Sequence, residues 1–205
     1  ARDTGDGGPA LLVGAPWPRD GKLYNAALLL DGGRIAAEVR KHELPNYGVF
    51  DERRVFAAGP LSGPVEFRGA RLGVMVCEDM WIPDVAECLA ESGAEILVVI
   101  NGSPFETDKK DERLGHATAR IGECGLPLVY VNLVGGQDEL VFDGASFVLG
   151  ADYSLRAQAR AWETQVLVTR WRRGEAGGAD AGWVCDQAPI APSHPEHEAI
   201  YRALL

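Results

Sequence analysis

The sequence L-G-V-M-V-C-E-D-M-W at Leu72–Trp81 decides the fold and carries the first candidate for chemistry. Its first five residues are apolar on both faces, which is typical of a strand buried within a sheet. The strand ends at Cys77, and ligands bind at the carboxyl ends of strands in open α/β sheets. A thiolate there attacks amide or nitrile carbon well, provided that a base and a cation lower its pKa. The alternative is a buried structural cysteine, since free cysteine is among the most buried residue types.

The residues that follow alternate between helical and strand patterns. Apolar spacing predicts a helix at Pro83–Glu91, and Ile96–Ile100 is predicted as the next buried strand. A second helix is predicted at Asp111–Cys124, and a further strand at Leu128–Val134. This alternation indicates an α/β layered fold. Other strands are predicted at Ala10–Gly14, Ala26–Leu30, Arg34–Val39, Val65–Phe67, Ser146–Leu149 and Gln165–Trp171.

Both ends of the chain differ in composition from its middle. Ala1–Pro9 is rich in Gly and Asp and is predicted to be a loop or a truncated start, so we expect the chain to begin part-way into a longer protein. Residues 10–187 form the predicted main domain, with a flexible Gly/Ala-rich loop at Gly174–Gly182. Residues 188–205 are predicted to be a Pro-rich linker followed by a helix at Pro195–Leu205, which would open another domain.

The composition of the 205 residues is that of a globular protein, with 46% hydrophobic and 24% charged residues and a formal net charge of −10. The absence of a basic stripe argues against a nucleic-acid partner. Neither a signal peptide nor a long apolar run is present, so no membrane partner is expected. The four cysteines have no C-x-x-C spacing, which argues against a metal site and favours reduced thiols in the cytoplasm.

A second candidate cluster lies at Arg40–Glu52, just past a predicted strand. A fixed ammonium at Lys41 could stabilise an oxyanion or hold a cysteine as thiolate, although most lysines at strand ends are simply solvated. Pro45 and Gly48 stiffen the loop, which favours a built site. His42 is a weaker candidate for a Cys-His pair, because nothing in the sequence positions it.

A third cluster, Asn101–Phe105 (N-G-S-P-F), follows the strand predicted at Ile96–Ile100, with Lys109 and Lys110 beyond it. Its backbone and hydroxyl groups could grip a polar substrate. An ordinary strand-to-helix turn explains the same residues equally well, because Asn, Gly, Ser and Pro are the standard turn residues.

The three motifs together resemble one known family. Leu44–Glu52 (L-P-N-Y-G-V-F-D-E), Cys77–Trp81 (C-E-D-M-W) and Asn101–Phe105 are similar, in this order, to the nitrilase-type carbon–nitrogen hydrolase domain of bacterial glutamine-dependent NAD synthetases. The likeness runs from about Gly14 to the C-terminus, where Pro195–Leu205 resembles the start of the ATP-dependent synthetase domain. It implies an α/β fold of the nitrilase-like α-β-β-α sandwich type, four-layered when dimerised, here lacking its first strand and helices.

The resemblance also implies roles for individual residues. The family uses a Glu–Lys–Cys triad, in which Lys41 would be the catalytic lysine and Cys77 the nucleophile. Glu52 would be a supporting carboxylate near the lysine. The glutamine pocket would be lined by Tyr47, Glu78, Ser103 and Lys109.

The implied reaction is hydrolysis of the glutamine amide, with the ammonia used to amidate deamido-NAD to NAD. The hydrolytic part would need neither a cofactor nor a metal, whereas the synthetase domain of the same chain would use ATP and magnesium. The expected partners are glutamine, that synthetase domain and further copies of the chain in a homo-oligomer.

One part of the family pattern has no match in the sequence. The triad glutamate belongs to a segment upstream of the matching stretch, and the acidic residues before Lys41 lie in no corresponding motif. We therefore expect the 205-residue chain alone to be inactive. Two other functions stay open: a stand-alone nitrilase-family amidase or carbamoylase, and an assembly module that kept the fold without the chemistry.

Overall fold

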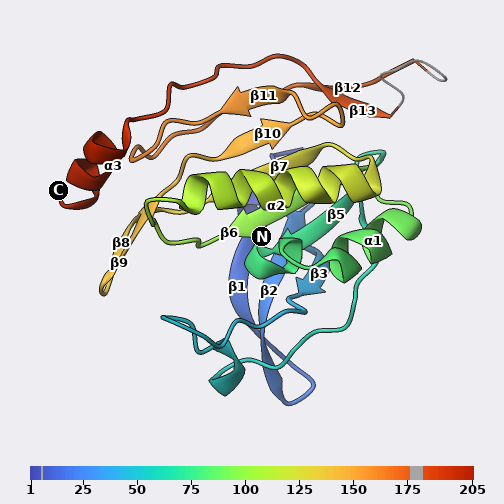
Figure 1. The fold of residues 1–205 in the computed structure, drawn as a ribbon. Coiled ribbons are helices and arrows are strands. Elements are labelled where there is room, and N and C mark those ends of the chain that lie inside the picture. Colours follow the sequence, from blue (N-terminus) through green and yellow to red (C-terminus); the bar gives the residue numbers. More distant parts are fainter. Residues whose placement is uncertain (6, 176–181) are drawn as a thin grey trace. The chain divides into compact units, whose positions relative to one another are not determined.

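A computed structural model describes residues 1–5, 7–175 and 182–205 of the chain (Figure 1). The chain divides into two compact units, Ala1–Ala94 and Glu95–Leu205. The described residues form a mixed α/β structure with antiparallel and parallel strand pairs and three α-helices. Among them, none of the helices has both the length and the apolar character that a membrane crossing demands.

The first unit begins with the short 3-10 helix η1 (Arg2–Thr4) and a three-stranded antiparallel sheet. The sheet has the order β1-β2-β3, with β1 at Leu11–Arg19, β2 at Lys22–Asp31 and β3 at Arg34–Arg40. Gly32 and Gly33 connect β2 to β3, and both have positive φ angles (58° and 75°), which a two-residue hairpin turn requires.

The prolines at 16 and 18 predicted that the first strand would end at Gly14. In the structure, β1 continues through both of them. The prediction was wrong because β1 is an edge strand of its sheet and pairs with β2 on one side only. A proline is tolerated there, since its missing N–H can face away from the partner strand.

The hairpin of β4 (Val65–Phe67) and β5 (Ala70–Val76) supplies the centre of the first unit. Met75 is fully buried, and Val74 and Val76 are nearly so. β5 contacts helix α1 (Pro83–Glu91) as well as β2 and β3, which explains why its sequence is apolar on both faces.

The second unit contains the predicted strand–helix–strand segment. Strand β6 (Ile96–Asn101) runs parallel to β7 (Leu128–Asn132), and helix α2 (Lys109–Cys124) connects them. β7 then pairs with β10 (Phe147–Leu149), and β10 pairs with β11 (Leu155–Gln158), both antiparallel. The parallel pair brings the ends of β6 and β7 to one edge, where Asn101 lies opposite Asn132.

Two hairpins of the second unit depart from the predicted pattern. The predicted strand at Leu128–Val134 is broken at Leu133, and β8 (Val134–Gln137) forms a separate hairpin with β9 (Leu140–Asp143). The strand predicted at Gln165–Trp171 is wrong, because only Trp171 joins a strand, β12 (Trp171–Arg173), which pairs with β13 (Trp183–Cys185). Its alternating valines are exposed instead of facing a sheet: Val166 is 91% exposed and Val168 is 70% exposed.

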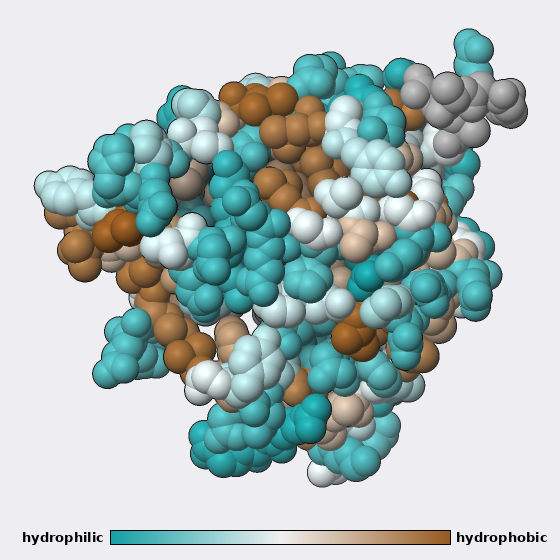
Figure 2. All heavy atoms as spheres, viewed as in Figure 1, coloured by the Kyte–Doolittle hydropathy of each residue, from teal (hydrophilic) through white to brown (hydrophobic). Residues whose placement is uncertain are grey.

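The C-terminal residues include the predicted helix, α3 (Glu196–Ala203). The segment before it lies along β11, because the Gln158 N–H donates to the Pro189 carbonyl and the Ala191 N–H donates to the Gln158 carbonyl, both at 3.0 Å. Leu204 and Leu205, at the end of this helix, are exposed. Figure 2 shows hydrophobic surface (brown) beside the C-terminal helix, at the left of the view. Most of the loop predicted at Gly174–Gly182 lies outside the described residues.

Candidate functional site

Cys77 stands at the carboxyl end of β5, where the chain turns sharply. The residue has φ = 53°, in the left-handed region that residues other than glycine rarely adopt, and it begins the 3-10 helix η3 (Cys77–Met80). Holding a non-glycine residue in that region costs on the order of 1–3 kcal/mol, so the surrounding structure must fix it. Such strain occurs preferentially at functional sites, and here it falls on the predicted nucleophile.

Lys41 directly follows β3 and is fully buried, with 0% exposure. Its backbone is held on both sides: its N–H donates to the Asn25 carbonyl at 2.8 Å, and its carbonyl accepts from the Gly59 N–H at 2.7 Å. Its ammonium Nζ donates to Glu52 Oε1 at 2.7 Å. A buried cation needs such a partner, and the solvated alternative considered for Lys41 is therefore wrong.

Glu52 begins the short 3-10 helix η2 (Glu52–Arg54), at the end of the stiff loop that contains Pro45 and Gly48. One carboxylate oxygen accepts from Lys41, and the other accepts from Asn25 Nδ2 at 3.4 Å. The carboxylate therefore bridges the loop, the residue after β3 and strand β2.

Asp79 ties the turn at Cys77 to the segment at Lys41. Its Oδ1 accepts from the backbone N–H groups of His42 (3.0 Å) and Glu43 (2.8 Å), and its Oδ2 accepts from the N–H of Val76 (3.1 Å). Burial raises the pKa of the Asp79 carboxyl, while these three donors oppose the rise. This role of Asp79 was not predicted from the sequence. An acidic residue close after a buried strand is the signal that could have indicated a carboxylate that caps backbone N–H groups.

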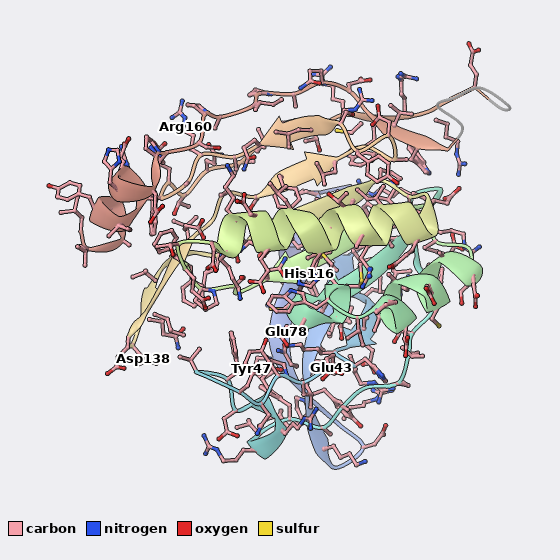
Figure 3. The ribbon with its side chains drawn as sticks, in the orientation of Figure 1. Glu43, Tyr47, Glu78, His116, Asp138 and Arg160 are labelled. Carbon is pink, nitrogen blue, oxygen red and sulfur yellow. The ribbon has the colours of Figure 1, made fainter. Side chains whose placement is uncertain are left out.

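Tyr47 and Glu78 form a second pair beside Cys77 in the same unit. The Tyr47 hydroxyl donates to Glu78 Oε1, and both side chains are labelled in Figure 3. Glu78 is buried, whereas Tyr47 is half exposed. The predicted members Lys41, Tyr47, Glu52, Cys77 and Glu78 thus all belong to the first unit.

The electrostatics around Cys77 come from burial and from this cluster. Burial raises the pKa of the Cys77 thiol, the Lys41 ammonium lowers it, and the Glu78 and Glu52 carboxylates raise it further. The net direction is upward, so the resting group is a thiol that needs a base before it can act as a nucleophile.

His42 has a structural contact that explains its place in the cluster. Its Nδ1 lies 2.8 Å from the Gly59 carbonyl. Among the described residues, no group of three His, Cys, Asp or Glu side chains comes together as a metal site.

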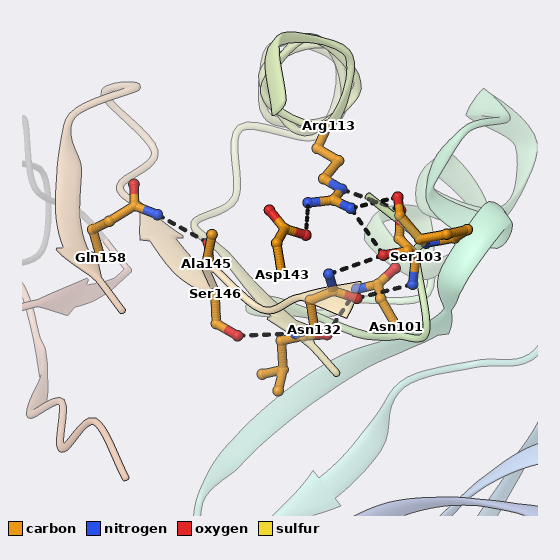
Figure 4. Close-up of polar contacts among 10 residues, drawn as sticks. Asn101, Ser103, Arg113, Asn132, Asp143, Ala145, Ser146 and Gln158 are labelled. Atoms are coloured by element: carbon orange, nitrogen blue, oxygen red, sulfur yellow. Dashed lines mark hydrogen bonds and ion pairs between the residues drawn. The ribbon is translucent and has the colours of Figure 1, made fainter. Parts of the chain in front are cut away.

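In the second unit, Ser103 is the centre of a buried polar network at the ends of β6 and β7 (Figure 4). Arg113 on α2 donates to Ser103 Oγ (3.1 Å), to the carbonyls of Ser103 (2.8 Å) and Pro104 (2.9 Å), and to Asp143 Oδ1 (2.8 Å). Asn132 accepts from the Ser103 N–H at 2.9 Å and donates to its carbonyl at 3.1 Å.

Lys109 lies at the first position of α2 and is largely buried. Its ammonium pairs with Glu112 at 2.8 Å and approaches Glu106 at 3.9 Å. The structure therefore places Ser103 and Lys109 in the same loop-to-helix segment. The sequence predicted neither Arg113 nor Asn132, because their partners lie far apart along the chain.

Comparison with known proteins decides the family. The sequence matches the family described as Carbon-nitrogen hydrolase over residues 4–179. The chain belongs to this family. The resemblance drawn from the three motifs is confirmed, and so is the nitrilase-like α/β fold class.

Similar curated proteins share one name. The chain is 46% identical over 198 residues to the glutamine-dependent NAD(+) synthetase of Rhodobacter capsulatus, which covers 97% of this chain and 35% of that protein. It is 41% identical over 181 residues to the one of Xanthomonas campestris pv. campestris, covering 87% of this chain and 33% of that protein. The chain thus spans about a third of the length of these relatives.

Solved structures give the same picture of the fold. The glutamine-dependent NAD+ synthetase of Acinetobacter baumannii, solved in complex with ADP, has a TM-score of 0.85 and 32% identity, covering 95% of this chain and 36% of that one. A variant of the amidase of Nesterenkonia sp. AN1 in complex with butyramide has a TM-score of 0.64 and 28% identity, covering 74% of this chain and 57% of that one.

Proposed function

We propose that this chain is the glutamine-hydrolysing part of a glutamine-dependent NAD(+) synthetase and that Cys77 is its nucleophile. One observation carries the proposal: a buried Lys41 ammonium, held by Glu52, acts on a cysteine in a strained turn at the end of β5. The names of the relatives supply the substrate, glutamine, and the cytoplasmic setting predicted from the sequence fits four cysteines used as thiols.

The first chemical step is attack on the side-chain amide of glutamine. A base takes the proton from the Cys77 thiol, and the thiolate sulfur bonds to the amide carbon. The two described carboxylates that act on the Cys77 pKa are engaged elsewhere, Glu52 with Lys41 and Glu78 with Tyr47. We therefore assign the base to a third carboxylate, the triad glutamate of the family, and give Glu52 the task of holding Lys41.

The attack places negative charge on the former amide oxygen. The Lys41 ammonium is suited to stabilise this oxyanion, because it is fixed and dry and Glu52 engages only one of its hydrogens in the bond described. The backbone N–H that follows Cys77 is a second donor for the same oxygen. Collapse of the intermediate breaks the C–N bond, and the amide nitrogen leaves as ammonia after it has taken the proton from the base.

The second half of the reaction frees the enzyme. A thioester joins Cys77 to the glutamyl group, and a water molecule deprotonated by the base attacks its carbonyl carbon. The C–S bond breaks, glutamate leaves, and the sulfur regains a proton. Ammonia is then the nucleophile with which an ATP- and magnesium-dependent synthetase domain of the same chain amidates deamido-NAD.

Substrate binding is assigned by the chemistry of the remaining candidates. The Glu78 carboxylate and the Tyr47 hydroxyl suit the α-ammonium of glutamine, because charged hydrogen bonds to a buried carboxylate are strong. Ser103 and Lys109 suit its carboxylate. We propose these four residues as substrate-binding residues, and a homo-oligomer as the working assembly.

The decisive experiment uses the full-length natural protein. Cys77→Ala is expected to abolish NAD synthesis from glutamine while leaving synthesis from free ammonia within about twofold of wild type. Cys88→Ala, a cysteine on α1, is the matched control and is expected to keep both activities. Glutamine-dependent synthesis by the Cys77→Ala variant would rule out the proposed nucleophile.

A small-amide hydrolase is the second candidate, because the Nesterenkonia amidase shares the fold and 28% of the aligned residues. The two functions differ in their preferred substrate. A glutaminase of this type hydrolyses glutamine far faster than butyramide, whereas an amidase shows the reverse order when released ammonia is measured for both compounds.

A further inference from the structure

We propose that Asp79 is a positioning residue of the hydrolytic reaction, whose carboxylate fixes the turn that carries Cys77 against the segment that carries Lys41. The inference rests on the proposed roles of Cys77 as the nucleophile and of Lys41 as the cation that stabilises the oxyanion. Asp79 itself would touch no substrate atom, because both of its oxygens accept from backbone N–H groups. All the residues concerned belong to the first unit.

The first task of Asp79 is to close the turn at Cys77. Its Oδ2 accepts from the N–H of Val76, three residues back along the chain, at 3.1 Å. Such a bond, from the third residue of a helix to the backbone N–H of its N-cap, is one half of a capping box. The turn needs this support, because the φ angle of 53° at Cys77 costs on the order of 1–3 kcal/mol. Asp79 therefore helps to hold the nucleophile in a conformation that its own backbone disfavours.

The second task of the carboxylate is to hold the backbone that directly follows Lys41. Its other oxygen, Oδ1, accepts from the N–H groups of His42 at 3.0 Å and of Glu43 at 2.8 Å. Gly59 fixes the same segment, because its N–H donates to the Lys41 carbonyl at 2.7 Å and its carbonyl lies 2.8 Å from His42 Nδ1. One carboxylate thus joins the residue before Cys77 to the two residues after Lys41.

A carboxylate is the group that this double task requires. Asp79 is only 2% exposed, and its three N–H donors leave it little freedom to rotate. Hydrogen bonds to an ionised acceptor are also stronger than those between neutral groups. An asparagine has nearly the same shape but offers a single acceptor oxygen, so it cannot serve both segments.

The consequence for the reaction concerns the separation of the Cys77 sulfur and the Lys41 ammonium. The ammonium lowers the pKa of the Cys77 thiol, whereas burial and the carboxylates of Glu78 and Glu52 raise it. Coulomb energy falls as two charges move apart, and a displacement of about 1 Å in a site can cost about a hundredfold in rate. Without Asp79 to join the two segments, the ammonium is therefore expected to act less on the thiol and on the oxyanion.

The test measures the Cys77 alkylation rate against pH in the full-length protein, for wild type and Asp79→Asn. The loss of a negative charge alone would favour the thiolate and move the profile to lower pH, whereas the loss of a positioned ammonium moves it to higher pH. We expect a shift to higher pH by about half a unit or more. In a Lys41→Met background the same substitution is expected to cause no upward shift, because the ammonium that Asp79 positions is gone.

The kinetics of glutamine-dependent NAD synthesis give a second readout. Asp79→Asn is expected to lower kcat about tenfold or more, with the smaller effect on KM, because the positioned ammonium acts on the transition state. Synthesis from free ammonia is expected to stay within about twofold of wild type. Asp84→Asn is the matched control, since Asp84 is an exposed acid in the first turn of α1. The control is expected to change neither the kinetics nor the alkylation profile.

Folding of the variants is read in the same samples. Cys88 is a half-buried cysteine on α1 in the same unit, so its own alkylation rate reports whether that unit stays folded. If Asp79→Asn exposes Cys88, Asp79→Glu takes its place, because glutamate keeps the charge and both oxygens but moves them by one methylene group. Asp79→Glu is expected to move the Cys77 profile to higher pH and to lower kcat in the same way.

The outcomes separate the two proposals. Glutamine-dependent synthesis by Cys77→Ala would end the proposed function, whatever the Asp79 variants do. If Cys77→Ala loses that activity but Asp79→Asn keeps the wild-type kcat, or its alkylation profile stays in place or moves to lower pH, the inference is overturned. It is also overturned if the upward shift is equally large in the Lys41→Met background, which would show that Asp79 acts independently of Lys41.

Discussion

At the scale of single residues, the proposed chemistry depends on two opposing effects on one sulfur atom. Burial and two carboxylates raise the pKa of Cys77, whereas Lys41 lowers it. Lys41 is buried, and Glu52 supplies at 2.7 Å the partner that a buried cation needs. The ammonium of the Lys41–Glu52 pair is therefore suited to stabilise an oxyanion. The same ammonium makes the Cys77 thiol easier to ionise than burial alone would allow.

The signs of these effects are testable in the Cys77 alkylation rate measured against pH. Lys41→Met removes the group that lowers the pKa and is expected to move the alkylation profile to higher pH by about one unit or more. Glu78→Gln removes a carboxylate that raises the pKa without touching the Lys41–Glu52 pair, and it is expected to move the profile to lower pH. Site-resolved mass spectrometry after brief iodoacetamide treatment gives the rates. Coincident profiles for the three proteins would contradict the proposed coupling.

Asp79 gives a prediction about stability. Asp79→Ala removes the acceptor of three backbone N–H groups and is expected to lower the free energy of unfolding by about 2–4 kcal/mol. Asp79→Asn keeps one acceptor oxygen for His42 and Glu43 and is expected to lose less. Urea unfolding measures both. Wild-type stability of the alanine variant would show that the carboxylate does not hold the two segments together.

At the scale of elements, the site is built where strands end and loops return. Lys41 follows β3 and Cys77 follows β5, and both strands pack in the same unit. Gly59 lies against the residue before Lys41, and its N–H donates to the Lys41 carbonyl. A Cβ atom on Gly59 would lie 2.5 Å from the Arg40 carbonyl oxygen and 2.6 Å from the Arg40 Cβ, so only glycine fits.

Gly59→Ala is therefore expected to displace the segment that holds Lys41 and to lower the free energy of unfolding by at least about 2 kcal/mol. Gly63→Ala is the matched control, because no atom lies within 4 Å of its added Cβ. The control is expected to stay within about 0.5 kcal/mol of wild type. Equal stability of the two variants in urea unfolding would contradict the close approach at Gly59.

Local signals predicted much of the fold and only part of the site. The apolar run before Cys77 and the double glycine after Asp31 indicate their strands because the pattern and turn chemistry are local. The Gln165–Trp171 strand was wrong because alternation alone does not supply a pairing partner. Asp79 and Arg113 were missed for a related reason, since their roles depend on contacts with residues distant in sequence, such as Glu43 and Asp143.

At the scale of the whole molecule, the described residues include the proposed nucleophile and the proposed oxyanion-stabilising cation, and the base is assigned to a further carboxylate. The 205-residue chain alone is therefore expected to release no glutamate from glutamine, because the Cys77 thiol stays protonated near neutral pH. A coupled glutamate assay on the purified chain measures this. Turnover comparable to that of the full-length protein would show that a residue of this chain serves as the base.

We propose that Cys77, activated beside Lys41, attacks the glutamine amide carbon. The most direct measurement is site-resolved labelling of the full-length protein with the chloroketone analogue of glutamine. Cys77 is expected to be modified first, glutamine is expected to protect it, and Lys41→Met is expected to slow the modification about tenfold or more. Equal modification of Cys77, Cys88, Cys124 and Cys185, unaffected by glutamine, would contradict the account and favour an assembly module without chemistry.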